Sequence, residues 1–409
     1  MQPQSPSESP PCWPTRRSWG MYFSLALLAA ATIVAAAQTA CGQEFSDRPV
    51  TAPGGPGGMV TLQTIAPPRP LVAEGATYLA YELQLTNYQS LPIELVSMRV
   101  ESGKTRFDFD ATAVKTMIDL PQRDAPQGQE LIIAPLATRI VLVWLRFSST
   151  GALPGDLIDR FTYRFVGSAP APPMTVVSTA QPIDRTTPST IAPPLRGVRW
   201  VAANGPSNTS SHRRAMFAFN GKLYFPERFA IDYIQVDDEG RSYSGDPKRN
   251  ASYHCYGAPI LAVAAGKVIA TTDGIPDNIP GSLAVTPTLN NLGGNIVLID
   301  LGHGRYAFYA HLIPGSLKVH RGQQVHAGEV LGRVGNSGNS SEPHLHFHLV
   351  DGPSGLGAQG IPYAIDRFML RPARLIETND QWHIRKENGR TQMVRDSLML
   401  DGAVVDFPD

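Results

Sequence analysis

Short apolar runs in which every second residue is polar or small constrain the fold of this chain most. In the segment 79–86 the alternate positions are large and apolar: Leu79, Tyr81, Leu83, Leu85. A period of two is the period of a β-strand, whose successive side chains point to opposite faces. The chain also holds 37 glycines and 36 prolines, which interrupt the apolar runs with turns. We therefore predict an all-β protein.

The N-terminal half has the pattern of a β-sandwich. Further apolar runs follow at residues 93–100, 131–133, 140–145 and 160–165. Roughly seven short strands separated by turns predict a sandwich of immunoglobulin-like size over residues 76–168. It contains no cluster of catalytic side chains, so we expect a spacer or an accessory domain that could bind a protein partner.

Two segments rich in proline flank this predicted sandwich. Residues 41–75 contain the runs Pro53–Gly58 and Pro67–Pro70, and residues 169–195 are rich in proline, serine and threonine. Both compositions are typical of linkers.

The first 40 residues have the composition of an export segment. Arg16 and Arg17 precede an uncharged stretch from residue 21 to residue 37, and small residues follow it. We expect a signal peptide, with an uncleaved membrane anchor, or a lipid on Cys41, as the alternatives. The protein is then exported to the periplasm or cell envelope, and it meets a membrane only through such an anchor or lipid.

Charge and cysteine content exclude two classes of function. Lysine plus arginine and aspartate plus glutamate both number 35, so the net charge of zero gives no electrostatic footprint for nucleic acid. The three cysteines include no C-x-x-C pair, which excludes a cysteine-cluster zinc site.

The chemistry-bearing segment is Pro343-His344-Leu345-His346-Phe347-His348. On a strand, residues i and i+2 face the same side, so the imidazoles of His344 and His346 converge while Leu345 and Phe347 face the core. His311 lies in another run of period two, and Asp232 stands between two apolar residues. A buried aspartate needs a cationic partner, which either a metal ion or a nearby arginine would supply.

These residues resemble the lysostaphin-type (LytM) zinc metallopeptidases, metallopeptidase family 23. The resemblance rests on four motifs in order: Asp232, Tyr309-x-His311-Leu312, Val334-Gly335-Asn336-Ser337-Gly338, Pro343-His344-Leu345-His346-Phe347. It implies a β-sheet domain of the duplicated-hybrid-motif kind, which we place at residues 196–370, with a C-terminal β extension at 371–409. It also implies Asp232 and His346 as zinc ligands, and His311 and His344 as the catalytic histidines.

The pattern departs from the family at one ligand. The family's first ligand is a histidine four residues before the aspartate, and that position here is Arg228. Arginine stays protonated and cannot bind zinc. We expect His212 to supply the third ligand, with His254 and His348 as lesser candidates. His348 shares a strand face with His344 and His346 and is expected beside the ligands or in solvent.

A predicted hairpin is the route by which His212 would reach the site. Asn220-Gly221 predicts a two-residue turn that folds a strand at 211–219 onto residues 222–232. In strict register His212 lies on the face away from Asp232. A one-residue slip at Pro226 would turn it toward Asp232.

Three other histidines and two loops complete the candidates. His303, His320 and His326 lie among turn residues and are expected in solvent. The long loop 273–295 and the segment 360–363 are expected to wall a substrate cleft.

Together these features predict a zinc-dependent endopeptidase that cleaves the peptide cross-links of peptidoglycan. Two alternatives remain: a degenerate LytM-type domain that binds and activates another cell-wall hydrolase, for which Arg228 is the argument, and a zinc hydrolase with another substrate.

Overall fold

The computed structural model of the protein describes residues 59–119, 128–148, 153–167, 172–378 and 381–408. The predicted export segment at residues 1–40 lies outside this part of the chain. Residues 54–409 form one compact unit. No helix among the described residues is long and apolar enough to span a membrane.

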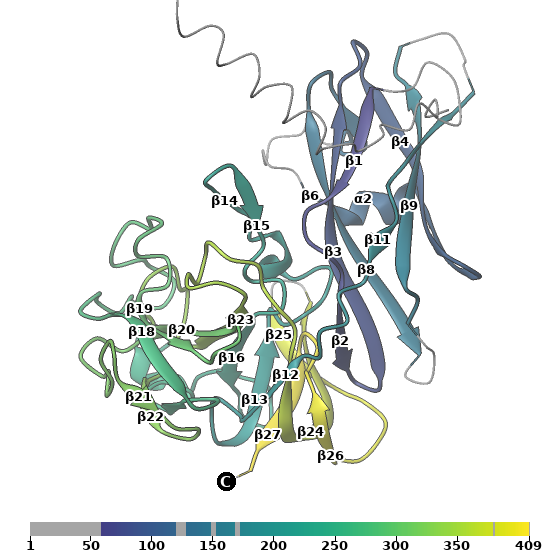
Figure 1. Ribbon diagram of the computed structural model, residues 1–409. Coiled ribbons are helices and arrows are strands. Elements are labelled where there is room, and N and C mark those ends of the chain that lie inside the picture. The colour runs from purple at the N-terminus through teal and green to yellow at the C-terminus, as the bar shows by residue number, and fades with distance from the viewer. Residues whose placement is uncertain (1–58, 120–127, 149–152, 168–171, 379–380, 409) are drawn as a thin grey trace, which may run out of the picture. The chain divides into compact units, whose positions relative to one another are not determined.

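Two antiparallel sheets form the N-terminal part of this unit (Figure 1). The first sheet has five strands: β1 (Val60–Thr64), β2 (Arg69–Ala73), β3 (Ala76–Asn87), β6 (Ile118–Asp119), β8 (Thr138–Ser148). The second has six: β4 (Ile93–Ser102), β5 (Thr105–Asp110), β7 (Ile132–Ile133), β9 (Asp156–Phe165), β10 (Met174–Val177), β11 (Gln181–Pro182). One helix, α2 (Ala111–Met117), starts where the Asp110 carboxylate accepts the N–H of Ala113.

The two sheets share one apolar core, to which Leu83, Val100 and Phe161 contribute from three different strands. The predicted all-β class is therefore correct. That the sandwich is of the immunoglobulin type stays a prediction.

Both segments predicted as linkers contain strands. The predicted linker 41–75 contains β1 and β2, and the predicted linker 169–195 contains β10, β11 and the strand β12 (Ser189–Ile191). These strands pair at the edges of sheets, where proline is tolerated because one side of the strand needs no hydrogen-bond donor. Proline content alone therefore gave the wrong assignment.

Strand β3 is buried on both faces. Leu79, Tyr81 and Leu83 point into the sandwich core, whereas Tyr78 and Ala80 belong to a second core that also holds residues of the C-terminal part. The alternation in sequence predicted the strand correctly, but it did not predict that its second face would also be covered.

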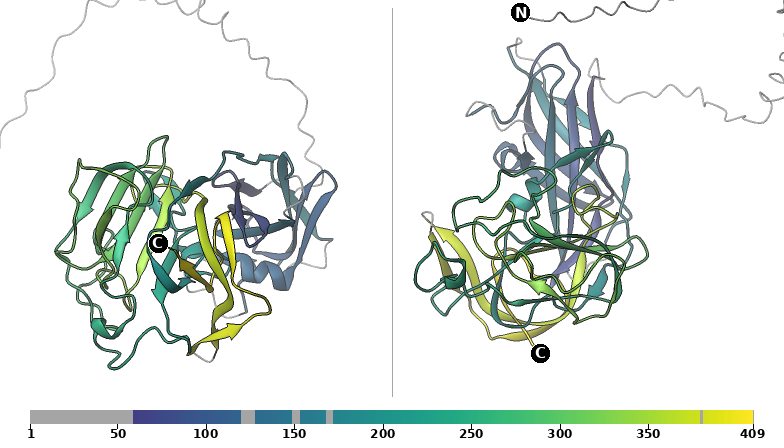
Figure 2. Two further views of the ribbon diagram at one scale, coloured as in Figure 1. Left: turned by 90° about the horizontal axis from the view of Figure 1, so that it is seen from below. Right: turned by 90° about the vertical axis from the view of Figure 1, so that its left-hand side faces the viewer.

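A large sheet forms the C-terminal part, in the order β12-β24-β27-β13-β16-β23-β20-β19-β18-β21, with β25 and β26 paired to β24. Its further strands are β13 (Gly197–Ala203), β16 (Ile231–Gln235), β18 (Gly266–Thr272), β19 (Asn295–Asp300), β20 (Tyr306–Leu312), β21 (Gln324–Val325), β23 (Leu345–Val350), β24 (Tyr363–Thr378), β25 (Gln381–Lys386), β26 (Gln392–Ser397), β27 (Ala403–Phe407). Figure 2 shows these strands from two further directions.

Smaller elements complete this part of the chain. Two two-stranded sheets are formed by β14 (Phe217–Phe219) with β15 (Lys222–Tyr224) and by β17 (Pro259–Leu261) with β22 (Val330–Arg333). Two short 3₁₀ helices are η1 (Ser211–Arg214) and η2 (Asn250–Ser252).

The boundary expected at residue 370 falls inside β24, and β27 pairs with both β13 and β24. The C-terminal residues thus complete the large sheet instead of extending from it.

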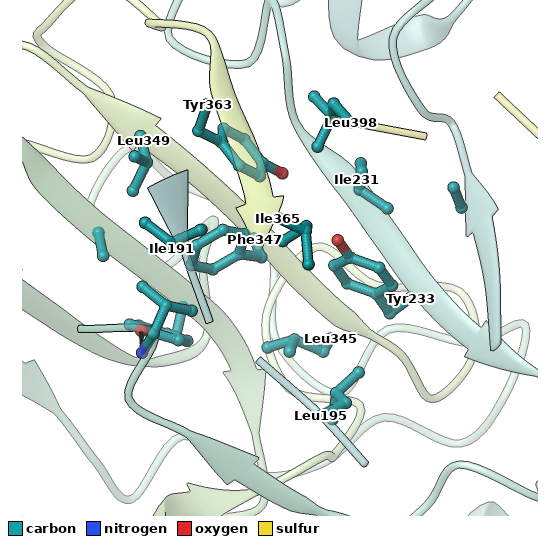
Figure 3. Close-up of a cluster of buried hydrophobic side chains, with 14 of the residues drawn as sticks. Ile191, Leu195, Ile231, Tyr233, Leu345, Phe347, Leu349, Tyr363, Ile365 and Leu398 are labelled. Atoms are coloured by element: carbon teal, nitrogen blue, oxygen red, sulfur yellow. Dashed lines mark hydrogen bonds between the residues drawn. The ribbon is translucent and has the colours of Figure 1, made fainter. Parts of the chain in front are cut away.

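The core behind the site is built from alternate residues of neighbouring strands. Ile231 and Tyr233 of β16 and Leu345 and Phe347 of β23 point into it and pack with Tyr363 (Figure 3). The residues between them, on the opposite face of the same two strands, therefore form a separate surface, and this surface carries the polar site.

Candidate metal centre and its cleft

The centre of the site is a cross-strand pair. Asp232 of β16 lies directly opposite His346 of β23, so the two side chains share one face of the sheet. The Nδ1 atom of His346 is 2.9 Å from Oδ1 of Asp232. Both side chains are buried.

His212 joins this pair by a route that differs from the predicted one. It lies in the 3₁₀ turn η1 and not in a strand, because the hairpin β14–β15 has only three residues in each strand. The predicted register of that hairpin is present, with Phe217 opposite Tyr224, but no slip is needed. The Nε2 atom of His212 is 3.3 Å from Oδ2 of Asp232.

One ligand atom each from His212, Asp232 and His346 lies within 4.8 Å of the others. Asn204 contacts two of these three residues. Its side-chain amide donates to Oδ2 of Asp232 at 2.9 Å, and its backbone carbonyl oxygen is 2.8 Å from Nδ1 of His212. Since Nδ1–H then donates to that carbonyl, Nε2 is the nitrogen of His212 that faces Asp232 and could bind a metal ion. Two imidazole nitrogens and one carboxylate oxygen form a donor set that suits zinc.

His311 enters the site through a β-bulge. Val297 and Asn295 of β19 pair with Tyr309 and Leu312 of β20, so two residues of β20 stand where β19 has one. His311 accordingly has a φ of 66°, in the left-handed region. Plain alternation would have turned its side chain away from the face of Ala310, and the bulge re-aims it. Its ring centre lies 4.6 Å from that of His344.

A loop of glycine, asparagine and serine orients both of these histidines. The Ser337 carbonyl accepts from Nδ1 of His311 at 2.7 Å, and the Glu342 carbonyl accepts from Nδ1 of His344 at 2.8 Å. The Nε2 atoms of both rings are therefore the ones free to accept a proton. That of His344 is 3.4 Å from Asp232.

His348 is fully buried and continues the histidine row. Its Nδ1 is 2.9 Å from Nε2 of His346, and its Nε2 is 3.0 Å from the carbonyl oxygen of Gly355. The remaining histidine candidates His254, His303, His320 and His326 are exposed and lie outside the cluster.

Arg228 points away from the cluster into a buried ion pair. Its guanidinium donates to both carboxylate oxygens of Glu82, with Nε 2.8 Å from Oε1, and NH1 donates to the carbonyl of Gly360 at 2.8 Å. Arg228 therefore has a structural partner, and nothing at its position could bind a metal.

Charges around the cluster decide its protonation. Burial alone would raise the pKa of Asp232, but the imidazoles of His212 and His344 outweigh it and hold that pKa well below its ordinary value. Burial lowers the pKa of His212, yet Asp232 outweighs it and raises that pKa to about 9. Burial and His344 hold the pKa of His311 well below its ordinary value. The Asp232 carboxylate is therefore ionised and attracts a cation.

The cluster opens into a cleft of about 490 Å³. Leu292 and Gly293 line it, so part of the loop 273–295 forms a wall as expected. The segment 360–363 does not line it, because Gly360 packs against Arg228 instead. Glu227 also lines the cleft, 4.0 Å from His346 Nε2.

The sequence did not single out Asn204 or Glu227. Asn204 gave no signal because it lies in no motif. Glu227 could have been found, since it precedes Arg228 in the segment that was searched for the missing ligand.

Comparison with known proteins finds a family match that covers part of this site. Residues 251–355 match peptidase family M23, a stretch that includes His311, His344 and His346 but begins after Arg228 and Asp232. The chain thus carries a LytM-type domain of that family. Its variant first motif lies outside the matched stretch.

Two curated relatives match over parts of the same domain. The cell division protein DipM of Caulobacter vibrioides is 33% identical over 98 residues, which are 24% of this chain and 13% of that protein. The peptidoglycan DD-endopeptidase ShyA of Vibrio cholerae is 35% identical over 86 residues, which are 21% of this chain and 20% of that protein. The chain therefore spans at most a fifth of the length of either relative.

Among solved structures, the catalytic domain of lysostaphin from Staphylococcus simulans is 25% identical. The match covers 30% of this chain and 87% of that domain, with a TM-score of 0.19.

Proposed function

We propose that the protein is an exported zinc-dependent endopeptidase that cleaves peptide cross-links of peptidoglycan. The observation that carries the proposal is the convergence of His212, Asp232 and His346 in the lining of a cleft, which His311 and His344 also line. A domain that had lost its chemistry would have no physical need for all five groups.

In this proposal His212, Asp232 and His346 hold the metal. A zinc ion held there acts as a Lewis acid, which makes water a nucleophile near neutral pH and polarises a carbonyl group. His346 would bind through Nδ1, the atom that faces Asp232. Its Nε2–H would then donate to Nδ1 of His348, whose Nε2–H donates to the carbonyl of Gly355.

His311 and His344 are the proposed catalytic histidines. Because each ring donates its Nδ1–H to a backbone carbonyl, each has its Nε2 lone pair directed away from that carbonyl. One such atom can accept the proton of the attacking water. The other ring, when it is also protonated on Nε2, can donate a hydrogen bond to the developing oxyanion. Fixed ring orientation favours both steps, because neither imidazole must turn during the reaction.

The proposed substrate rests on the family and on the cleft. ShyA is named a peptidoglycan DD-endopeptidase, and the cleft is open at a volume of about 490 Å³, which suits an extended peptide. Exported localisation follows from this substrate.

Digestion of purified peptidoglycan tests the proposal. The full chain should convert cross-linked muropeptides to uncross-linked ones, detected by mass spectrometry, and a chelator should abolish the conversion. His344→Ala should lower the rate by a factor of about 100 or more, in the usual range for general acid–base catalysis. His326→Ala, at an exposed histidine, should not change the rate.

A negative digestion would distinguish the alternatives. If the folded protein binds about one zinc per chain but leaves cross-links intact, the peptidoglycan substrate is wrong, and cleavage of an unrelated protein substrate would identify another hydrolase. If it binds no zinc yet still binds the wall or another hydrolase, the result supports a degenerate LytM-type domain that is not an enzyme.

A further inference from the structure

A buried carboxylate of the sandwich contacts Arg213, the residue that follows the proposed ligand His212. Glu82 of β3 has no exposed surface, and it accepts hydrogen bonds from two arginines of the LytM-type domain, Arg213 and Arg228. A buried ion group of this kind is strongly disrupted when one member is removed, because the charge that remains has no partner.

One of these arginines is the direct neighbour of the proposed ligand His212. Arg213 is fully buried, and its NH2 also donates to the carbonyls of Tyr81 at 3.2 Å and Val143 at 3.3 Å, both in the sandwich. His212 and Arg213 lie in a turn of four residues, η1. In so short an element, the anchored guanidinium also fixes the backbone of its neighbour.

Residues on either side of His212 and Arg213 also contact the sandwich. The amide of Asn208 donates to the carbonyl of Leu142 at 3.0 Å, and Arg214 donates to that of Thr116 at 3.3 Å. The hairpin β14–β15 that follows pairs with no third strand in the described part of the chain. No ladder of backbone hydrogen bonds therefore joins this hairpin to the large sheet. The contacts with the sandwich fix the turn that precedes it.

We propose that Glu82 is a positioning residue for the metal centre, acting through Arg213 on the turn that places His212. Arg228, which occupies the family's usual ligand position, is the second arginine that donates to Glu82. In this proposal the sandwich helps to build the metal centre and is more than a spacer. The link to zinc rests on the proposed function.

Zinc affinity of the full chain gives the first test. Glu82→Gln should weaken zinc binding by about 10–100-fold, the usual effect of removing a group that orients a ligand. Glu74→Gln is the matched control, because Glu74 also belongs to the sandwich region and accepts two hydrogen bonds from one arginine, Arg374, at 2.7 and 2.8 Å. It should leave zinc affinity unchanged.

A double-variant cycle separates positioning from general damage. If Glu82 acts through His212, Glu82→Gln should cause no further loss of affinity in a His212→Ala background. An equal loss in both backgrounds, or unchanged affinity in folded Glu82→Gln, would overturn the proposal. If Glu82→Gln does not fold, Arg213→Lys keeps the buried charge but cannot make all three contacts, and it should show the same non-additive loss.

Hydrogen exchange makes the test independent of zinc. Amides of residues 208–214 should exchange faster in Glu82→Gln but not in Glu74→Gln. If the wild type binds no zinc while this difference is present, the proposed function fails and the positioning role stands. If the difference is absent, the positioning role fails whatever the metal content.

Discussion

At the scale of single residues, His346 has a different partner on each ring nitrogen. Asp232 contacts Nδ1 and His348 contacts Nε2. Such a partner on the second nitrogen fixes the tautomer and the ring orientation of a metal ligand. The sequence placed His348 on the correct strand face but could not show its burial, because burial depends on Gly355 and Phe308 from other segments.

His348→Leu should weaken zinc binding by about 10–100-fold, because it leaves His346 Nε2 and the carbonyl of Gly355 without their partner. His348→Asn should retain more affinity, since its side-chain oxygen can accept near the place of Nδ1. Zinc titration against a competing chelator measures both. Equal affinity of the leucine variant and the wild type would contradict the tautomer assignment.

A second residue-scale feature is a carboxyl group inside the sandwich. Asp159 of β9 is fully buried and accepts the hydroxyl of Tyr81 at 2.7 Å. Burial raises its pKa from 3.8 to about 6, although the hydrogen bond from Tyr81 acts in the opposite direction. The folded state therefore retains this proton at a pH where the unfolded chain has lost it.

This shift predicts that the free energy of unfolding falls as the pH rises from about 4 to about 6, by roughly 3 kcal/mol from this group. Asp159→Asn should remove that component. The free energy of unfolding of the variant, minus that of the wild type, should therefore increase over this window and then level off. Urea unfolding at several pH values measures it. A difference that does not change with pH would contradict the buried, protonated carboxyl.

Among the elements, a β-bulge and a 3₁₀ turn orient His311 and His212, two residues of the proposed site. The alternating pattern predicted the strands β16, β20 and β23. It could not predict the bulge at His311 or the 3₁₀ turn at His212, because both depend on which strands or domains lie alongside. The predicted route for His212 was wrong for this reason, although the residue itself lies at the cluster.

The loop after β22 contains a glycine that no other residue can replace easily. Gly338 has a φ of 78°, and a Cβ atom there would lie 2.3 Å from the backbone nitrogen of Gly294. Its neighbour Ser337 supplies the carbonyl that orients His311. Backbone displacement at this point would therefore change the orientation of His311, a proposed catalytic histidine.

Gly338→Ala should lower the free energy of unfolding by several kcal/mol and reduce peptidase activity. The matched control is Gly304→Ala, where φ is 70° but nothing lies within 4 Å of the added atom, so the cost should be only about 1–2 kcal/mol. Denaturant unfolding of both variants gives the comparison. Equal destabilisation would show that the close approach to Gly294 does not matter.

At the scale of the whole molecule, the sandwich and the LytM-type domain share one core. Leu71 and Tyr78 from the first sheet belong to the same buried cluster as Phe229, Tyr309 and Phe347. The sequence predicted both regions from their local patterns. It could not predict their shared core or the ion pair of Glu82, because these contacts join segments more than 100 residues apart.

A continuous core predicts that residues 59–408 unfold in one cooperative transition. Differential scanning calorimetry of the full chain should give a single peak, with equal calorimetric and van't Hoff enthalpies. Two resolved transitions would show that the sandwich and the LytM-type domain are separate folding units.

If His212 supplies the third ligand in place of Arg228, a crystal structure of the zinc-loaded full chain will show it. Zinc should lie about 2.0–2.2 Å from Nε2 of His212, a carboxylate oxygen of Asp232 and Nδ1 of His346. Zinc bound to Asp232 and His346 with His212 uncoordinated, or no zinc at this site in folded protein, would contradict it.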